Sequence, residues 1–186
     1  MSKKKIVKSM KERYLESVSQ LQSALDKDNA MEVPKITKVV INSGVGRITK
    51  ESDKMNEVFE SLSLIAGQTP VKTKVKNSIA GFKVREGQIV GYKITLRGMK
   101  MWDFLTRLVG VSLPRVRDFR GLNLSAIDSN GNLNIGITDH TIFPEIIPEK
   151  VKYIFGLQVS VVTTADNKKD AELLFRTLSF PIKKNN

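Results

Sequence analysis

The sequence predicts an α+β fold: a single domain with a mostly antiparallel sheet, helices on one face of it, and an open polar and basic face on the other. Three observations predict this class. Segments with helical spacing and segments with strand-like alternation are interspersed along the chain. The strand segments alternate apolar and polar residues, so one face of the sheet is apolar and the other is not. The amphipathic helices need an apolar surface to cover, and that sheet face supplies it.

Each element follows from local spacing and from the turn residues that bound it. The expected helices are residues 6–25, 52–66 with a stop at Gly67, 99–109 closed by Gly110, a short helix from Pro148 to Gly156, and 168–178. The expected strands are residues 36–41, 71–76, 89–97, 133–137 and 157–164. The first helix, within residues 1–30, and a tail at 183–186 complete one domain of residues 1–186.

The strand at 89–97 shows the alternation most clearly. Its even positions are apolar, and its odd positions from 93 to 97 are Lys, Thr and Arg. The strand at 71–76 repeats the pattern, with Val71 in the apolar set and Lys72 in the basic set. On the first strand, Lys38 and Asn42 share a parity, which assigns both to the polar face.

The positive charge of the chain is concentrated in one part of it. The formal net charge is +12, and residues 71–121 contain twelve Lys or Arg and three Asp or Glu. An excess this local indicates an anionic partner, and nucleic acid is favoured over a membrane surface because no basic amphipathic helix coincides with the peak. No apolar run has the length of a membrane span. The chain has no cysteine, which excludes disulfides and thiolate metal sites and fits a cytoplasmic location.

No group of residues predicts catalysis, a metal site or a cofactor. His140 is the single histidine, and a packing role is favoured over a general-base role beside Asp139. The stretch "VVINSGVGR" contains Gly44 and Gly46, but Thr49 stands where a dinucleotide fingerprint needs its third glycine. A small nucleotide-dependent enzyme therefore remains only as a weak alternative, and the chain is predicted not to be an enzyme.

Residues 77–88 are too many for a tight hairpin turn, and loops of this length are usually functional or disordered. A solvated hairpin tip would also suit lysines, but Phe82 between basic residues suits base stacking, and Lys83 and Arg85 suit phosphates. This loop is therefore predicted to contact nucleic acid.

The segment 113–121, "LPRVRDFRG", contains three arginines, Arg115, Arg117 and Arg120. They could form salt bridges with Asp118 and with distant carboxylates, or they could contact phosphate or carboxylate groups of a partner. The segment is predicted to be a further interface.

Several motifs resemble those of the bacterial large-subunit ribosomal protein five family, the 5S rRNA-binding proteins of the central protuberance. They include "VPKITKVVINSGVG", "SIAGFKVREG", "GYKITLRG", "PRVRDFRGL" and "GNLNIGI", in order along nearly the whole chain. The resemblance implies an α+β fold, 5S rRNA bound on the sheet side, and a long loop that touches P-site tRNA. It also implies contacts with 23S rRNA, with neighbouring central-protuberance proteins, and with protein thirteen of the small-subunit head.

Residue by residue, the resemblance implies 5S rRNA contacts at Asn42, Gln68 and Thr95, whose uncharged donors and acceptors suit sugars and base edges. The full set of expected 5S rRNA contacts is Lys35, Lys38, Asn42, Gln68, Thr69, Lys72, Lys93, Thr95 and Arg97. The expected tRNA-contacting loop is Ser78, Ile79, Ala80, Gly81, Phe82, Lys83, Val84 and Arg85.

The function predicted from the sequence is a structural constituent of the large ribosomal subunit. The alternative is a free RNA- or tRNA-binding chaperone or maturation factor that uses the same basic face. The two differ in whether the protein co-sediments with ribosomal subunits through a high-salt wash.

Overall fold

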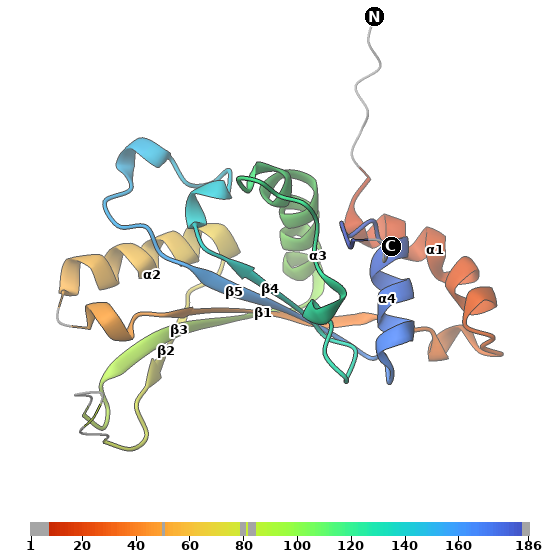
Figure 1. Cartoon of the computed structure of the whole chain (residues 1–186), viewed down its shortest axis with the longest axis horizontal. Coiled ribbons are helices and arrows are strands. Elements are labelled where there is room, and N and C mark those ends of the chain that lie inside the picture. The colour runs from red at the N-terminus through yellow and green to blue at the C-terminus, as the bar shows by residue number, and fades with distance from the viewer. Residues whose placement is uncertain (1–7, 50, 79–80, 82–84, 184–186) are drawn as a thin grey trace, which may run out of the picture. The chain divides into compact units, whose positions relative to one another are not determined.

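The computed structural model describes residues 8–49, 51–78, 81 and 85–183 (Figure 1). The strands are β1 (Ile36–Gly44), β2 (Val71–Lys74), β3 (Ile89–Leu96), β4 (Leu133–Ile137) and β5 (Leu157–Thr163). The α-helices are α1 (Met10–Ala24), α2 (Ser52–Ala66), α3 (Gly98–Arg107) and α4 (Lys168–Thr177). The strands form one antiparallel sheet in the order β2-β3-β1-β5-β4, which confirms the predicted α+β class.

The residues group into two compact units, and the strands β1, β4 and β5 are each divided between them. Unit 1 comprises Met1–Lys38, Arg97–Asn134 and Val161–Asn186, and unit 2 comprises Val39–Leu96 and Ile135–Ser160. In unit 1, α1 packs against α3 and α4. In unit 2, α2 packs against β3 on the face to which Tyr92 points, and the Phe59 and Tyr92 rings meet edge to face at 5.5 Å.

Two sequence predictions in unit 2 are confirmed closely. Helix α2 begins at Ser52, and it ends where Gly67 takes the left-handed conformation at φ 62°, which glycine adopts without a steric penalty. In β3 the apolar residues at 92, 94 and 96 are buried, whereas Lys93 is exposed. One face of the strand therefore lies against the core, and the other is open.

The face predicted for β2 is wrong. The β2–β3 register places Val71 opposite Lys93 and Lys72 opposite Tyr92, and directly opposed residues share a face. Val71 is 68% exposed, and the Lys72 ammonium lies 5.8 Å from the centre of the Phe59 ring. β2 is an edge strand whose four residues are all exposed, so burial did not constrain which residues face the core.

The alternation in β1 is also interrupted. Ile36 and Val39 are both buried although they have opposite parity, and regular alternation resumes only after Val39. From Val39 to Gly44 the alternation is regular, so Asn42 lies on the open face as predicted, whereas Lys38 falls within the interrupted stretch and is half-buried.

Two predicted helices have different ends. Gly110 was expected to close a helix, but it lies inside a π-helical turn, Leu108–Ser112, that continues α3, and it has no positive φ. The helix expected from Pro148 is only a 3-10 turn, Pro148–Lys150. Within the described residues, no helix is long and apolar enough to span a membrane.

Candidate nucleic-acid interface

The open face of unit 2 carries polar side chains on adjacent strands. The β1–β3 register pairs Asn42 with Lys93, and both are exposed. The flanking residues Ile41, Ser43 and Tyr92 are buried, so Asn42 and Lys93 point away from α2. An amide and an ammonium group thus stand side by side on this face, as the alternation of β3 predicts.

Thr95 and Gln68 also come together in unit 2. Thr95 is half-buried and lies opposite Val40 in the register, two residues from Lys93 on the same face. The Gln68 amide nitrogen donates a hydrogen bond of 3.4 Å to the Thr95 carbonyl. Thr69, which follows it, is exposed. Because Gln68 and Thr95 are 27 positions apart in the sequence, only the fold explains why two predicted contacts are neighbours.

Three other predicted contacts belong to unit 1. Lys35 and Arg97 are exposed, and Lys38 is half-buried. The Lys35 backbone donates to the Thr164 hydroxyl, and its carbonyl accepts from the Thr164 N–H, so the backbone is held while the ammonium group is left at the surface. Arg97 precedes α3 in an extended conformation and makes no side-chain cap to that helix.

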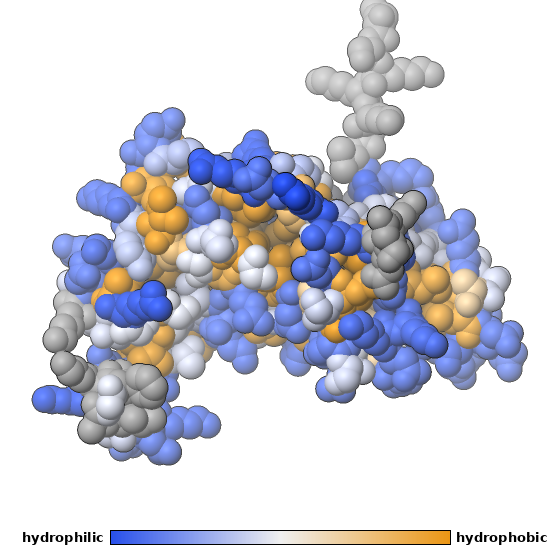
Figure 2. Space-filling view, in the orientation of Figure 1, coloured by the Kyte–Doolittle hydropathy of each residue, from blue (hydrophilic) through white to orange (hydrophobic). Residues whose placement is uncertain are grey.

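The hairpin that joins β2 to β3 has a well-defined stem. Val75 donates to the Gln88 carbonyl and accepts from Gly87, and the Arg85 N–H donates to the Gln88 side-chain oxygen. Ser78, Gly81 and Arg85 are exposed, and hydrophilic side chains project from this stem in Figure 2. The remaining predicted loop residues lie outside the described residues: Ile79, Ala80, Phe82, Lys83 and Val84.

The three arginines of the 113–121 segment, in unit 1, are all exposed. Asp118 has a left-handed backbone at φ 54° within this segment. In the part of the chain that the structure describes, neither Asp118 nor another carboxylate forms a salt bridge with Arg115, Arg117 or Arg120. Their guanidinium groups are therefore available for an anionic partner.

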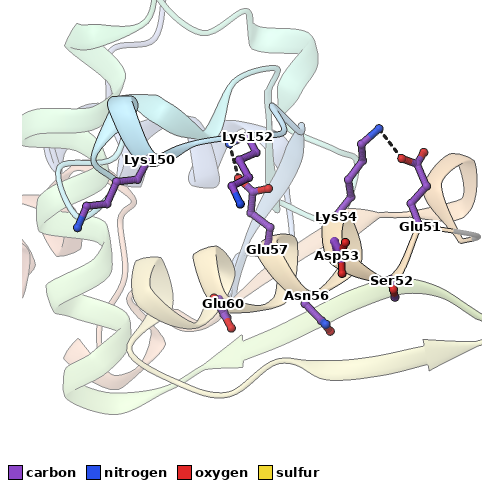
Figure 3. Close-up of a pocket in the computed structure, with 9 residues that line it drawn as sticks. All are labelled: Glu51, Ser52, Asp53, Lys54, Asn56, Glu57, Glu60, Lys150 and Lys152. Carbon is purple, nitrogen blue, oxygen red and sulfur yellow. Dashed lines mark hydrogen bonds and ion pairs between the residues drawn. The ribbon is translucent and has the colours of Figure 1, made fainter.

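Sequence reasoning missed an acidic groove in unit 2. It has a volume of about 820 Å³ and lies between α2 and the segment after Pro148, as Figure 3 shows. Glu51, Asp53, Glu57 and Glu60 line it from α2 and the residue before it, together with Lys54, which pairs with Glu51 at 2.6 Å. Lys150 and Lys152 line the other side. The signal was present in the sequence, because residues 51–60 contain four acidic residues and one basic residue within a strongly basic chain.

Glu57 holds the far wall of the groove to α2. Its carboxylate accepts a hydrogen bond from the backbone N–H of Lys152 at 2.6 Å (Figure 3) and one from the backbone N–H of Tyr153 at 3.2 Å. A second cavity of about 300 Å³ continues past Glu57 and is lined by Leu64 and Ile147, which are 62% and 51% exposed. With four carboxylates, three lysines and exposed apolar side chains, this surface has a small excess of negative charge within a strongly basic chain.

His140 packs inside unit 2, in agreement with the packing role predicted from the sequence. It is fully buried, its ring stacks on Phe155 at 4.0 Å, and its Nδ1 accepts the Phe155 N–H at 3.5 Å. Its Nε2 has no hydrogen-bond partner among the described residues. Burial lowers the pKa of His140 below the usual value, although the Asp139 and Glu57 carboxylates oppose the shift. The neutral ring is therefore the form that the folded state favours.

This burial predicts a pH-dependent stability. The unfolded chain binds the His140 proton at a higher pH than the folded chain, so stability falls as the pH drops below about 6.5, by at most about 1.4 kcal/mol per pH unit. The free energy of unfolding, measured by denaturant titration from about pH 7.5 to about pH 5, is expected to show this loss. His140→Gln should flatten the curve in that range, and parallel curves for the two proteins would contradict the assignment to His140.

Comparison with protein families gives two matches that together cover most of the chain. Residues 89–182 match the model that describes the C-terminus of the ribosomal L5 family. Residues 29–85 match the model described as ribosomal protein L5. The first match alone spans half of the chain, and the two meet at the hairpin between β2 and β3.

Proposed function

Because the chain belongs to the L5 family of ribosomal proteins, structural proteins of the large ribosomal subunit that bind rRNA, we propose that its rRNA is 5S rRNA, bound in the central protuberance of cytoplasmic ribosomes. The observation that carries the proposal is the open face of unit 2, where Asn42 and Lys93 stand side by side. Neutral amides and hydroxyls suit base edges and ribose, and ammonium groups suit phosphates.

The proposed contacts divide by chemistry. In unit 2, Asn42, Gln68, Thr69 and Thr95 offer uncharged donors and acceptors to sugars and bases. The proposed phosphate contacts are Lys93 in unit 2 and Lys35, Lys38 and Arg97 in unit 1. Lys72 is left out, because its ammonium group lies near Phe59 on the opposite face of the sheet.

A free RNA chaperone would use the same open face. The two functions are therefore distinguished by whether the protein stays bound to the large ribosomal subunit. A structural constituent should co-sediment with large subunits through a high-salt wash. Loss of the protein into the supernatant, with the subunits still intact, would favour the chaperone.

The hairpin between β2 and β3 is the proposed contact with P-site tRNA. Its stem is fixed by the hydrogen bonds of Val75, Gly87 and Gln88, and it lies at the edge of the sheet that β2 forms. Lys83 and Arg85 supply the phosphate contacts in this proposal, and Phe82 supplies an apolar surface.

Substitutions in the loop should affect tRNA binding without affecting the 5S rRNA binding that is proposed for the sheet face. Lys83→Ala with Arg85→Ala is expected to leave the affinity for 5S rRNA within about twofold and to weaken tRNA retention on reconstituted particles about tenfold or more, because two phosphate contacts are lost. Filter binding with each RNA measures both effects. Lys168→Ala with Lys169→Ala, which removes the same charge at the start of α4, is the control. A double loop variant that loses 5S rRNA and keeps tRNA would reverse this assignment.

The acidic groove is the proposed contact for a protein partner. Its carboxylates, with the exposed Leu64 and Ile147 in the neighbouring cavity, complement a segment with basic and apolar residues. Among the partners that the family resemblance implies, protein thirteen of the small-subunit head is the one proposed here. Crosslinks from the groove in assembled ribosomes that reach only rRNA would overturn this proposal. The remaining arginines, Arg115, Arg117 and Arg120, are proposed to contact 23S rRNA.

A further inference from the structure

A shallow hollow of about 530 Å³ lies on the open face of unit 2, at one end of strands β1, β5 and β4. Six exposed residues surround it, and we call them the glycine hollow: Asn42, Gly44, Gly136, Thr138, Gly156 and Gln158. Each strand, with the residue next to its end, contributes one glycine and one uncharged polar residue. Ile137 lies between Gly136 and Thr138 in the sequence, and Leu157 lies between Gly156 and Gln158. Both are buried and point to the core.

The fold itself accounts for only one of the three glycines. A Cβ at Gly156 would lie 3.1 Å from the Ile137 carbonyl oxygen, so the neighbouring backbone leaves little room there. A Cβ at Gly44 or at Gly136 would meet nothing within 4 Å, and neither residue has a positive φ. Gly136 lies inside β4, where glycine weakens a strand and often marks the close approach of a ligand.

The chemistry of the hollow points to a particular part of an RNA. Its side chains are two amides and a hydroxyl, and none of the residues around it is charged. A phosphate would be expected to select Lys or Arg, whereas a base edge and a ribose hydroxyl suit neutral donors and acceptors. Lys93, which pairs with Asn42 in the register, lies next to the hollow and not in it.

We infer that the glycine hollow seats one unstacked nucleotide of the bound rRNA, with its base and ribose against the bare backbone at Gly44 and Gly136. This inference rests on the proposed 5S rRNA function. It adds the place where the RNA comes closest to the protein backbone. Asn42, Thr138 and Gln158 hydrogen-bond the base edge and the ribose hydroxyls, and the adjoining phosphate is left to Lys93. A side chain at position 136 would fill the space that the nucleotide occupies.

The test is Gly136→Val in the full chain, with Gly44→Ala as a second variant in case the larger side chain disturbs the sheet. We expect Gly136→Val to weaken 5S rRNA binding about tenfold or more in filter binding, and Gly44→Ala to weaken it measurably. The midpoint of thermal unfolding should stay the same or rise, since valine favours strands more than glycine does. Gly110→Ala is the matched control, because a Cβ at that exposed glycine also meets nothing within 4 Å, outside the hollow.

The outcomes separate this inference from the function on which it rests. If the unmodified chain does not bind 5S rRNA, the proposed function fails, and the inference fails with it. If the unmodified chain binds and both hollow variants bind as tightly, the function stands and the hollow is not a nucleotide seat. Since the chain has no cysteine, Thr138→Cys also gives a single attachment point for a short photo-crosslinker. Crosslinks from it to one or two nucleotides of 5S rRNA support the seat, and no crosslink to the bound RNA contradicts it.

Discussion

The affinity of the full chain for 5S rRNA is expected to fall about 50- to 150-fold when the salt concentration rises from about 50 mM to about 200 mM. Each phosphate contact releases condensed counterions and contributes a slope of about −0.7 to −0.9 to log affinity against log salt. Lys35, Lys38, Lys93 and Arg97 therefore give a total slope of about −2.8 to −3.6. Filter binding at five or six salt concentrations measures it.

Single substitutions show which residues contribute to the slope of log affinity against log salt. Lys93→Ala should make the slope less steep by one contact, and it should weaken binding to all RNA sequences nearly uniformly. Lys169→Ala removes the same charge from an exposed position on α4 and should leave the slope unchanged. A binding constant that is flat across this salt range would contradict the proposed phosphate contacts.

Asn42→Ala is expected to weaken 5S rRNA binding by about 1–3 kcal/mol, or about 5- to 150-fold, because the RNA groups that its amide satisfies would be buried without partners. The side chain is exposed and forms no hydrogen bond with the described residues, so the free energy of unfolding should change by less than about 0.5 kcal/mol. Filter binding and denaturant titration measure the two quantities on the same preparation.

Asn167→Ala is the control for this substitution, because Asn167 is another exposed asparagine and makes no side-chain cap to α4. It should change neither the affinity nor the stability by more than a few tenths of a kcal/mol. If Asn42→Ala lowers the stability as much as the affinity, Asn42 belongs to the fold and not to the interface.

The sequence predicts best those strands for which only one orientation buries the apolar side chains. β3 is a central strand whose apolar residues must face α2, so its parity placed Lys93 and Thr95 on the open face correctly. The edge strand β2 has no such constraint, and its register with β3 reversed the faces predicted for Val71 and Lys72. In β1 the parity placed Asn42 correctly, because the alternation is regular from Val39 to Gly44 and is interrupted only between Ile36 and Val39.

Other features depend on contacts between distant residues and leave little local signal. Nothing near Glu57 in the sequence indicates that its carboxylate holds the backbone of Lys152, 95 positions away. The neighbours Gln68 and Thr95, and the glycines at 44 and 136, come together only when the sheet forms. Gly110 looked like a helix stop, but the chain turns through it without a positive φ, so residue type alone did not decide the end of α3.

The most direct test of the central claim is ultraviolet crosslinking of the tagged chain to RNA in cells, followed by sequencing of the RNA and mass spectrometry of the crosslinked peptides. We expect 5S rRNA to dominate the recovered RNA, with crosslinked residues within β1 and β3 on the face of Asn42 and Lys93. Recovery of other RNAs without 5S rRNA, or 5S rRNA crosslinks confined to α2 and the acidic groove, would contradict the account.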